Sequence, residues 1–204
     1  MRIENMTEQE HFSKYGYVIV RNMISEELTK FIADEFTMVR DVYHHVNNVP
    51  LEDTTRFGDS TVKHAFCYYA PLCFEILYPR IMPRCEAILN KKLFPSFSYA
   101  RILYKDAKME KHVDRASTTI NTTIIFENDP EPYDFWLTDL EDNDVALKLN
   151  AGDMCLFDGG KLNHWRDTYT GNKCIQASLG FANEEINMYD GRKMLGAPGI
   201  KGRK

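Results

Sequence analysis

The sequence predicts an α+β protein in which N-terminal helices support a β-rich core, a sandwich or a barrel. Helix-like apolar spacing occurs before Pro95, and short β-branched or aromatic runs separated by turn residues follow it. Leading helices followed by regularly spaced strands are typical of such folds. No linker divides the chain, so we expect one domain, 1–204. It would comprise a helical part at about 1–95, a β core at about 96–185 and a flexible basic tail at about 190–204.

The composition is that of a globular protein. The 204 residues are 44% hydrophobic and 27% charged, which excludes global disorder, and a net charge of −5 gives no basic field for nucleic acid or anionic membranes. No apolar signal region or membrane-length run occurs, so we expect a soluble, cytoplasmic protein. The five widely spaced cysteines predict reduced core residues rather than disulfides or a zinc site.

The first elements follow from capping and periodicity. EQEHFSKYG predicts a short helix and YVIV a strand, and Ser25 is placed to cap a helix over 25–42 whose apolar residues share one face. The polar stretch 44–64 predicts a long loop. Residues 71–94 are apolar enough for helix, which Pro79 and Pro83 should break or kink.

The β core is expected to contain six strands. Their boundaries are turn signals, among them NAGD at 150–153 and DGG at 158–160. The expected strands are 97–104, 117–126, 134–137, 145–149, 154–157 and 173–181.

One histidine and one aspartate stand two positions apart in KHVDRAS. On extended backbone His112 and Asp114 project to the same side, so both can touch one ion, although such a pair is also common on the wet face of a strand. His164, after a predicted strand and a glycine turn, is a candidate third ligand. Two histidines and a carboxylate form the facial triad of non-haem Fe(II) oxygenases. The neighbouring His44 and His45 point in different directions and are expected to be solvated or to face substrate.

This arrangement resembles the 2-oxoglutarate/Fe(II)-dependent dioxygenases, with the prolyl 4-hydroxylase-like branch most similar in layout. The resemblance rests on H-x-D near the start of the β core, a histidine about fifty residues later and a basic residue after it. It covers about 97–181, and HFSKYGYVIVRNMISEELTKFI looks like the family's N-terminal segment. It implies a double-stranded β-helix (a cupin-like jelly roll) in which His112, Asp114 and His164 hold Fe(II). It also implies 2-oxoglutarate and O2 as cosubstrates and ascorbate as a stimulant.

The resemblance further implies a cation for the distal carboxylate of 2-oxoglutarate. Relatives carry it nine or ten positions past the distal histidine, where this chain has Lys173; the alternative is a lysine that shields a strand edge. Tyr104 lies near a tyrosine that binds the same carboxylate in relatives, or it is a core residue. Arg101, a charge inside an apolar strand, is the alternative cation.

Other polar residues near the expected site have two readings. Arg115 and Arg166 flank the proposed ligands and either pair with Asp114, meet a substrate or lie on the surface. Thr119, Asn121 and Thr123 share one strand face, which either lines the pocket or faces water.

Substrate signals are weaker. The segment 127–144 has eight acidic residues and no lysine or arginine, which predicts a solvated hairpin or an acidic lip for a cationic substrate. The loop 44–64 and the tail beyond Tyr189 are candidate lids. Trp165 is either a substrate wall or core packing.

The resemblance implies a hydroxylase that couples oxidation to decarboxylation of 2-oxoglutarate to succinate. Its substrate would be an amino-acid or peptidyl group, prolyl among them, or another small molecule. We expect a monomer or homodimer with no nucleic-acid or membrane partner. Two alternatives are a zinc metallohydrolase, which needs a nearby general base and no 2-oxoglutarate cation, and a non-catalytic cupin-like binding protein.

Overall fold

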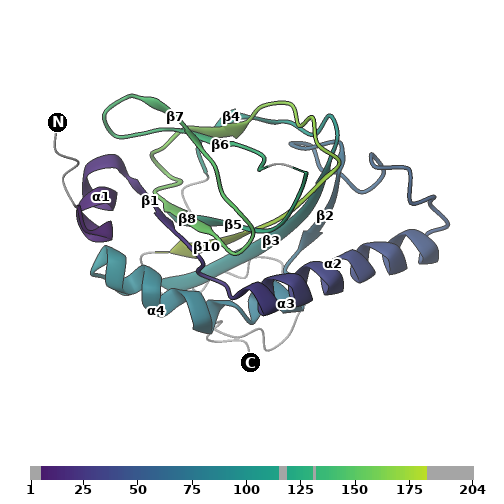
Figure 1. The fold of residues 1–204 in the computed structure, drawn as a ribbon, viewed down its shortest axis with the longest axis horizontal. Coiled ribbons are helices and arrows are strands. Elements are labelled where there is room, and N and C mark those ends of the chain that lie inside the picture. Colours follow the sequence, from purple (N-terminus) through teal and green to yellow (C-terminus); the bar gives the residue numbers. More distant parts are fainter. Residues whose placement is uncertain (1–5, 115–118, 131, 183–204) are drawn as a thin grey trace.

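Two antiparallel sheets face one another, and helices cover the outer face of the larger sheet (Figure 1). This computed structural model describes residues 6–114, 119–130 and 132–182. The larger sheet has the order β1-β8-β5-β10-β3-β2 and the smaller sheet β4-β9-β6-β7. The strands are β1 (Tyr17–Val20), β2 (Ala65–Tyr69), β3 (Phe94–Tyr104), β4 (Met109–His112), β5 (Ile120–Asp129), β6 (Phe135–Thr138), β7 (Asp144–Leu147), β8 (Met154–Phe157), β9 (His164–Arg166) and β10 (Lys173–Ala182).

The helices are α1 (Glu8–Tyr15), α2 (Glu26–Val46), α3 (Leu72–Glu75) and α4 (Tyr78–Leu89). Ser25 caps α2 as expected, its hydroxyl accepting from the Leu28 N–H. The proline prediction was partly wrong: Pro79 lies in the first turn of α4, where no intrahelical N–H is needed, and Pro83 is inside the helix without ending it. None of the helices in the described ranges has the length and apolar content to cross a membrane.

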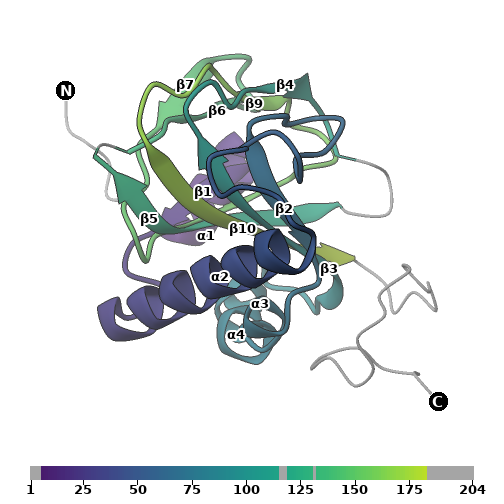
Figure 2. The same cartoon turned by 90° about the vertical axis from the view of Figure 1, so that its right-hand side faces the viewer.

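The larger sheet separates two apolar cores. On one side, α2, α3 and α4 pack against it around Phe36, Phe74 and Ile81. On the other, the two sheets enclose Phe135, Phe157 and further apolar residues. Figure 2 shows the same layers from the side, with α2, α3 and α4 below the larger sheet and the smaller sheet above it.

Several sequence expectations need adjustment. α2 continues to Val46 and takes in His44 and His45, so the loop is shorter than 44–64. β1 is the strand expected at YVIV, whereas β2 was not expected, and the two strands form the edges of the larger sheet. β8 has the bounds expected for it, whereas β4 and β9 were not recognised as strands. The tail expected at about 190–204 and Arg115 lie outside the described residues.

Candidate metal centre

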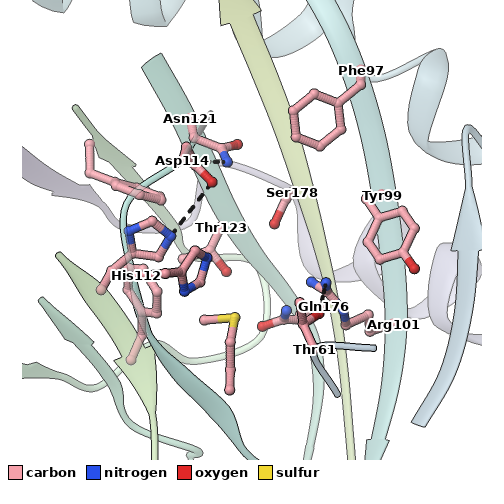
Figure 3. A pocket seen from close by; sticks show the side chains of 14 residues that line it. Thr61, Phe97, Tyr99, Arg101, His112, Asp114, Asn121, Thr123, Gln176 and Ser178 are labelled. Carbon is pink, nitrogen blue, oxygen red and sulfur yellow. Dashed lines mark hydrogen bonds and ion pairs between the residues drawn. The ribbon is translucent and has the colours of Figure 1, made fainter. Parts of the chain in front are cut away.

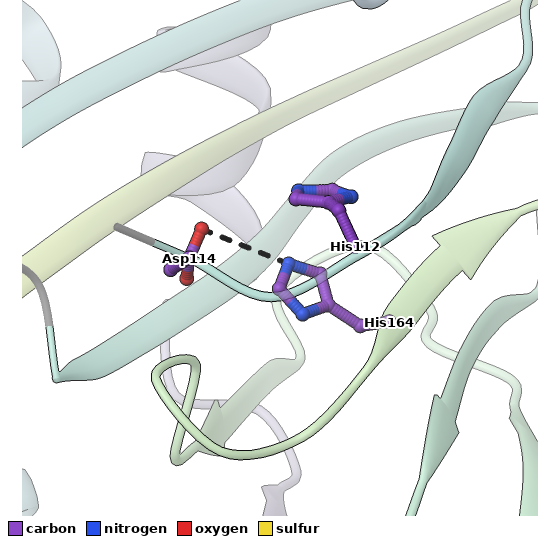
Figure 4. Close-up of side chains that lie close together, drawn as sticks. All are labelled: His112, Asp114 and His164. Atoms are coloured by element: carbon purple, nitrogen blue, oxygen red, sulfur yellow. Dashed lines mark ion pairs between the residues drawn. The ribbon is translucent and has the colours of Figure 1, made fainter. Parts of the chain in front are cut away.

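The smaller sheet brings the H-x-D pair and the distal histidine together. β4 and β9 are antiparallel neighbours in which His112 and His164 are paired, with ring centroids 4.4 Å apart. Asp114 follows β4, and its Oδ1 lies 3.8 Å from His164 Nε2 (Figure 4). One ligand atom from each of the three residues lies within 4.8 Å of the others. The expected ligand set is therefore one cluster.

Each histidine is oriented by the backbone carbonyl two positions before it. His112 Nδ1 lies 2.7 Å from the carbonyl oxygen of Glu110, and His164 Nδ1 lies 3.0 Å from that of Leu162. A carbonyl only accepts, so each Nδ1 carries the proton and donates it. The Nε2 lone pair of each ring is then available to a metal, as in histidine ligands held by backbone carbonyls.

The DGG turn holds Asp114 in place. Its backbone N–H donates to the carbonyl of Gly159 at 2.7 Å, and its Oδ2 accepts from Asn121 Nδ2 at 3.0 Å. A Cβ on Gly159 would lie 2.1 Å from the same Oδ2. The turn therefore needs glycine at 159 so that the carboxylate can lie beside it.

Burial keeps the distal histidine neutral. His164 is 3% exposed, and this burial lowers the pKa of its imidazole, although Asp114 acts in the opposite direction. Two neutral imidazoles and one carboxylate are a donor set that suits Fe(II) in a facial triad and also catalytic zinc.

A pocket extends from this cluster between the sheets (Figure 3). Its empty space is about 590 Å³, counting the open mouth. His112 and Asp114 lie at one side, Phe97 at another, and Arg101, Gln176 and Thr61 at the far end. The lining residues are Thr61, Phe97, Tyr99, Arg101, Met109, His112, Asp114, Asn121, Thr123, Phe135, Phe157, His164, Gln176 and Ser178.

Among the described residues, Arg101 is the one arginine or lysine that lines this pocket. Its Nη2 lies 3.2 Å from Asp59 Oδ2, and its guanidinium carbon lies 4.4 Å from the centroid of the Tyr99 ring. Tyr99 also donates its hydroxyl to Asp59, at 2.7 Å. The Arg101 Nε is buried without a partner in the described structure. Asp59 and Tyr99 thus hold the Arg101 guanidinium in place, while its Nε has no hydrogen-bond acceptor among the described residues.

Lys173 and Tyr104 lie on the other face of the larger sheet. They are paired across β10 and β3, and Tyr104 packs against the core on the helix side, where Arg40 donates to its hydroxyl. Lys173 forms an ion pair with Glu127 at 2.7 Å. Strand alternation explains this placement, because Lys173 and Gln176 differ by an odd number of positions. Lys173 and Tyr104 are not among the residues that line the pocket, whereas the alternative cation Arg101 is.

Arg166 is not on the surface, as one reading of the sequence had it. It is 2% exposed, donates from Nη1 to the carbonyl of Tyr133, and lies over the rings of Tyr133 and Phe135. Burial, the largest effect, lowers the pKa of its guanidinium, and nearby Arg101 acts in the same direction. Its Nε and Nη2 have no partner in the described part of the chain.

The remaining candidates are placed as follows. Thr123 lines the pocket with a buried, unpartnered Oγ1. His44 is buried in α2, where its Nδ1 lies 2.8 Å from the Pro50 carbonyl. Trp165 stacks on Trp136 at 5.8 Å and does not line the pocket. No acidic residue of 127–144 lines it either, among the residues described, so the acidic lip is not supported.

Phe97, Tyr99, Gln176 and Ser178 were missed as pocket residues, and Asp59 was missed as the partner of Arg101. For those on strands, a signal was present: Phe97 and Tyr99 share their parity with Arg101, and Ser178 shares its parity with Gln176. Asp59 comes from an irregular segment, whose approach to Arg101 has no sequence signature.

No family model and no curated protein matches the sequence. Solved structures do match. A prolyl-4-hydroxylase from Pseudomonas putida is 12% identical, with 86% of this chain and 97% of that chain covered, at a TM-score of 0.63. HygX from Streptomyces hygroscopicus, solved with nickel, 2-oxoglutarate and hygromycin B, is 11% identical with 87% of each chain covered, at 0.65. The epimerase SnoN, in complex with Fe3+, alpha ketoglutarate and nogalamycin RO, is 13% identical with 86% and 82% covered, at 0.66.

At this identity the likeness establishes the fold. The double-stranded β-helix expected from the resemblance is confirmed, with its two antiparallel sheets and N-terminal helices. The chain thus has the fold of the 2-oxoglutarate/Fe(II) oxygenases, and within it His112, Asp114 and His164 are gathered as the resemblance implied.

Proposed function

We propose that the protein is an Fe(II)- and 2-oxoglutarate-dependent oxygenase that hydroxylates a small-molecule or peptidyl substrate. The observation that carries this proposal is one pocket with two distinct ends. The His112–Asp114–His164 cluster lies at one side, and the guanidinium of Arg101 lies at the far end. A keto acid with a second carboxylate needs a metal and a cation separated in this way.

The residues fit these groups. Nε2 of both histidines and Oδ1 of Asp114 would hold the metal, which, with its cosubstrate bound, would supply O2 activation coupled to decarboxylation of 2-oxoglutarate to succinate. Three buried polar atoms of lining residues lack partners in the described structure: Thr123 Oγ1, Arg101 Nε and Gln176 Oε1. Buried polar groups are normally satisfied, so a polar occupant is expected beside them.

Arg101 takes the role that the sequence suggested for Lys173. A guanidinium can bind a carboxylate through two parallel hydrogen bonds, and Asp59 and Tyr99 hold this one at the pocket wall. Lys173 is on the wrong face of β10 and already paired. We therefore assign the distal carboxylate to Arg101.

The substrate would lie toward Phe97 and Ser178, on the side of the pocket away from Arg101. Phe97 offers an apolar wall, and Ser178 and Asn121 offer neutral hydrogen-bonding groups. This lining favours an uncharged portion of a small molecule or an amino-acid residue, such as prolyl, as the group that is oxidised.

A zinc hydrolase is less well supported. Such an enzyme needs a general base beside the metal-bound water. Among the described residues that line the pocket, Asp114 is the one carboxylate, and it belongs to the ligand cluster. A zinc hydrolase also does not require a cation such as Arg101 at the far end of the pocket.

The test is release of CO2 from labelled 2-oxoglutarate by the purified protein with Fe(II) and ascorbate. Slow release without substrate is expected from the wild type and is expected to be absent from His112→Ala. Absence of release, combined with tight four-coordinate zinc binding, would favour the hydrolase. Metal and 2-oxoglutarate binding without turnover on a wide set of substrates would favour a binding protein.

A further inference from the structure

Arg166 is a buried cation without a counter-ion in the described structure. It is 2% exposed, and its protein partners are the Tyr133 carbonyl and two aromatic rings. Nε and Nη2 are unpartnered, and Asp134 acts on the guanidinium electrostatically without forming an ion pair. A buried charge left in this state is costly, because its lost hydration is not replaced.

The charge of Arg101, in contrast, is already balanced. Asp59 lies 3.2 Å from its guanidinium, so the pair contributes little net charge to the end of the pocket. Arg101 can donate a hydrogen bond from its free Nε to an incoming carboxylate. Its positive charge is already neutralised by Asp59, so it cannot also neutralise the charge of that carboxylate. Arg166 is the cation in this region whose charge is not matched.

Gln176 lines one cavity with Arg101 and another with Arg166. It is paired with Arg101 across β10 and β3 in the larger sheet, and it lines the pocket. It also lines a narrow neighbouring cavity together with Arg166, which projects from β9 in the smaller sheet. Its own Oε1 is buried and unpartnered. The two arginines thus belong to different sheets, and each shares a cavity with this glutamine.

Water in the narrow cavity cannot solvate the Arg166 guanidinium. The cavity has no room for a water molecule, and it is lined by Val62, Leu103, Lys108, Met109, Tyr133, Arg166 and Gln176. The larger pocket, with which it shares Met109 and Gln176, is the adjoining space for an anion.

We propose that Arg166 is a second cation for the distal carboxylate of the cosubstrate, so that Arg101 and Arg166 form a two-arginine site at Gln176. This proposal rests on the proposed function and adds a residue to it. Arg101 supplies hydrogen bonds from the pocket wall, and Arg166 supplies the unmatched charge. Arg166 shares β9 with His164, two positions apart on the same inward face, so the strand that carries a metal ligand also carries this cation.

The experiment compares the binding of two keto acids to Ni(II)-loaded protein, measured by the shift of the thermal unfolding midpoint with ligand concentration. 2-Oxoglutarate has the distal carboxylate and 2-oxobutanoate does not, so the ratio of their affinities isolates the carboxylate site. The variant is Arg166→Met, and its matched control is Arg80→Met on the exposed surface of α4.

The proposal predicts that Arg166→Met lowers the preference for 2-oxoglutarate by about tenfold or more, the effect of losing a charged hydrogen bond. Its ligand-free midpoint should not fall, because an unmatched buried charge is replaced by an apolar side chain of similar length. Arg80→Met should keep the wild-type preference. An unchanged preference in Arg166→Met, or equal loss of both keto acids, would overturn the proposal and leave Arg166 a structural residue.

A second, independent test restores a positive charge at this site by freeing Arg101 from Asp59. In Asp59→Asn the charge of Arg101 is released, so Asp59→Asn/Arg166→Met should regain much of the lost preference, and Asp59→Asn alone should exceed the wild type. If Arg166→Met does not fold, Asp59→Asn alone decides. If its preference for 2-oxoglutarate over 2-oxobutanoate does not exceed that of the wild type, the proposal is overturned. Failure of the wild type to bind either keto acid would instead contradict the proposed function itself.

Discussion

His164 Nε2 lies 3.8 Å from Asp114 Oδ1, although the two residues come from separate segments of the chain. Backbone contacts hold both residues in place. The Leu162 carbonyl accepts a hydrogen bond from His164 Nδ1, and the Gly159 carbonyl accepts one from the Asp114 N–H. The imidazole and carboxylate are therefore directed at one another by the fold.

Removing a ligand should abolish metal binding and spare the fold. His112→Ala and His164→Ala each delete an imidazole that the backbone holds for the metal, so Fe(II) affinity should fall by more than the roughly 10- to 100-fold typical of losing a residue that only supports a ligand. Equilibrium dialysis under anaerobic conditions measures this. His45→Ala, on the exposed side of α2, is the control and should bind Fe(II) normally. Equal affinity in all three variants would place the metal elsewhere.

Gly159→Ala should weaken metal binding through Asp114. The added Cβ would lie 2.1 Å from Asp114 Oδ2, so the carboxylate must move, and a loss of about 10- to 100-fold in Fe(II) affinity is expected. Gly160→Ala is the matched control, because its nearest contact, Thr119 Cα at 3.6 Å, is an ordinary one. Metal titration of both variants decides. If the two lose the same amount, the effect comes from the turn in general and not from Asp114.

The two candidate cations can be separated directly. Arg101→Met should raise the 2-oxoglutarate concentration needed for half-maximal CO2 release by about tenfold or more, because it removes charged hydrogen bonds to the distal carboxylate. Lys173→Met should leave that concentration within about twofold of the wild type, since it lies on the helix side, paired with Glu127. The reverse result would restore the assignment first drawn from the spacing.

Asp59 should contribute to stability in a pH-dependent way. Burial alone would raise the pKa of its carboxyl, but Arg101, Thr61, Tyr99 and the Val62 N–H together hold the pKa well below its usual range. The unfolded chain then binds a proton more readily, so this stabilisation is present above about pH 4 and is lost as the pH falls below it.

The unfolding midpoints of wild type and Asp59→Asn test this. Their difference should be constant near neutral pH and shrink progressively below about pH 4. A difference that stays constant into strong acid would show that the Asp59 carboxylate is not held ionised by its neighbours.

The ligand cluster could be predicted because its signals are local. His112 and Asp114 are two apart on extended backbone, and the DGG turn marks the end of the strand before His164. β8 was predicted to the residue because NAGD and DGG bound it on both sides. Resemblance to a known family supplied the topology that joins these segments.

Local sequence signals did not identify the residue proposed to bind the distal carboxylate of 2-oxoglutarate. β10 is largely buried on both faces, so its hydrophobic pattern does not show which residues face the pocket, and spacing alone favoured Lys173 over Gln176. Arg166 is different: it is two positions after His164, and the rule that paired His112 with Asp114 would have turned it inward. The sequence left open whether Arg166 forms an ion pair with Asp114, contacts a substrate or lies on the surface, because most arginines are exposed.

The most direct test of this account is a crystal structure of the protein with Ni(II) and 2-oxoglutarate. The account predicts one metal ion bound by His112, Asp114 and His164, chelated by the keto-acid end of the ligand. The distal carboxylate should lie at Gln176 in contact with Arg101 and Arg166. A metal bound by other residues, or a ligand whose distal carboxylate contacts neither arginine, would contradict it.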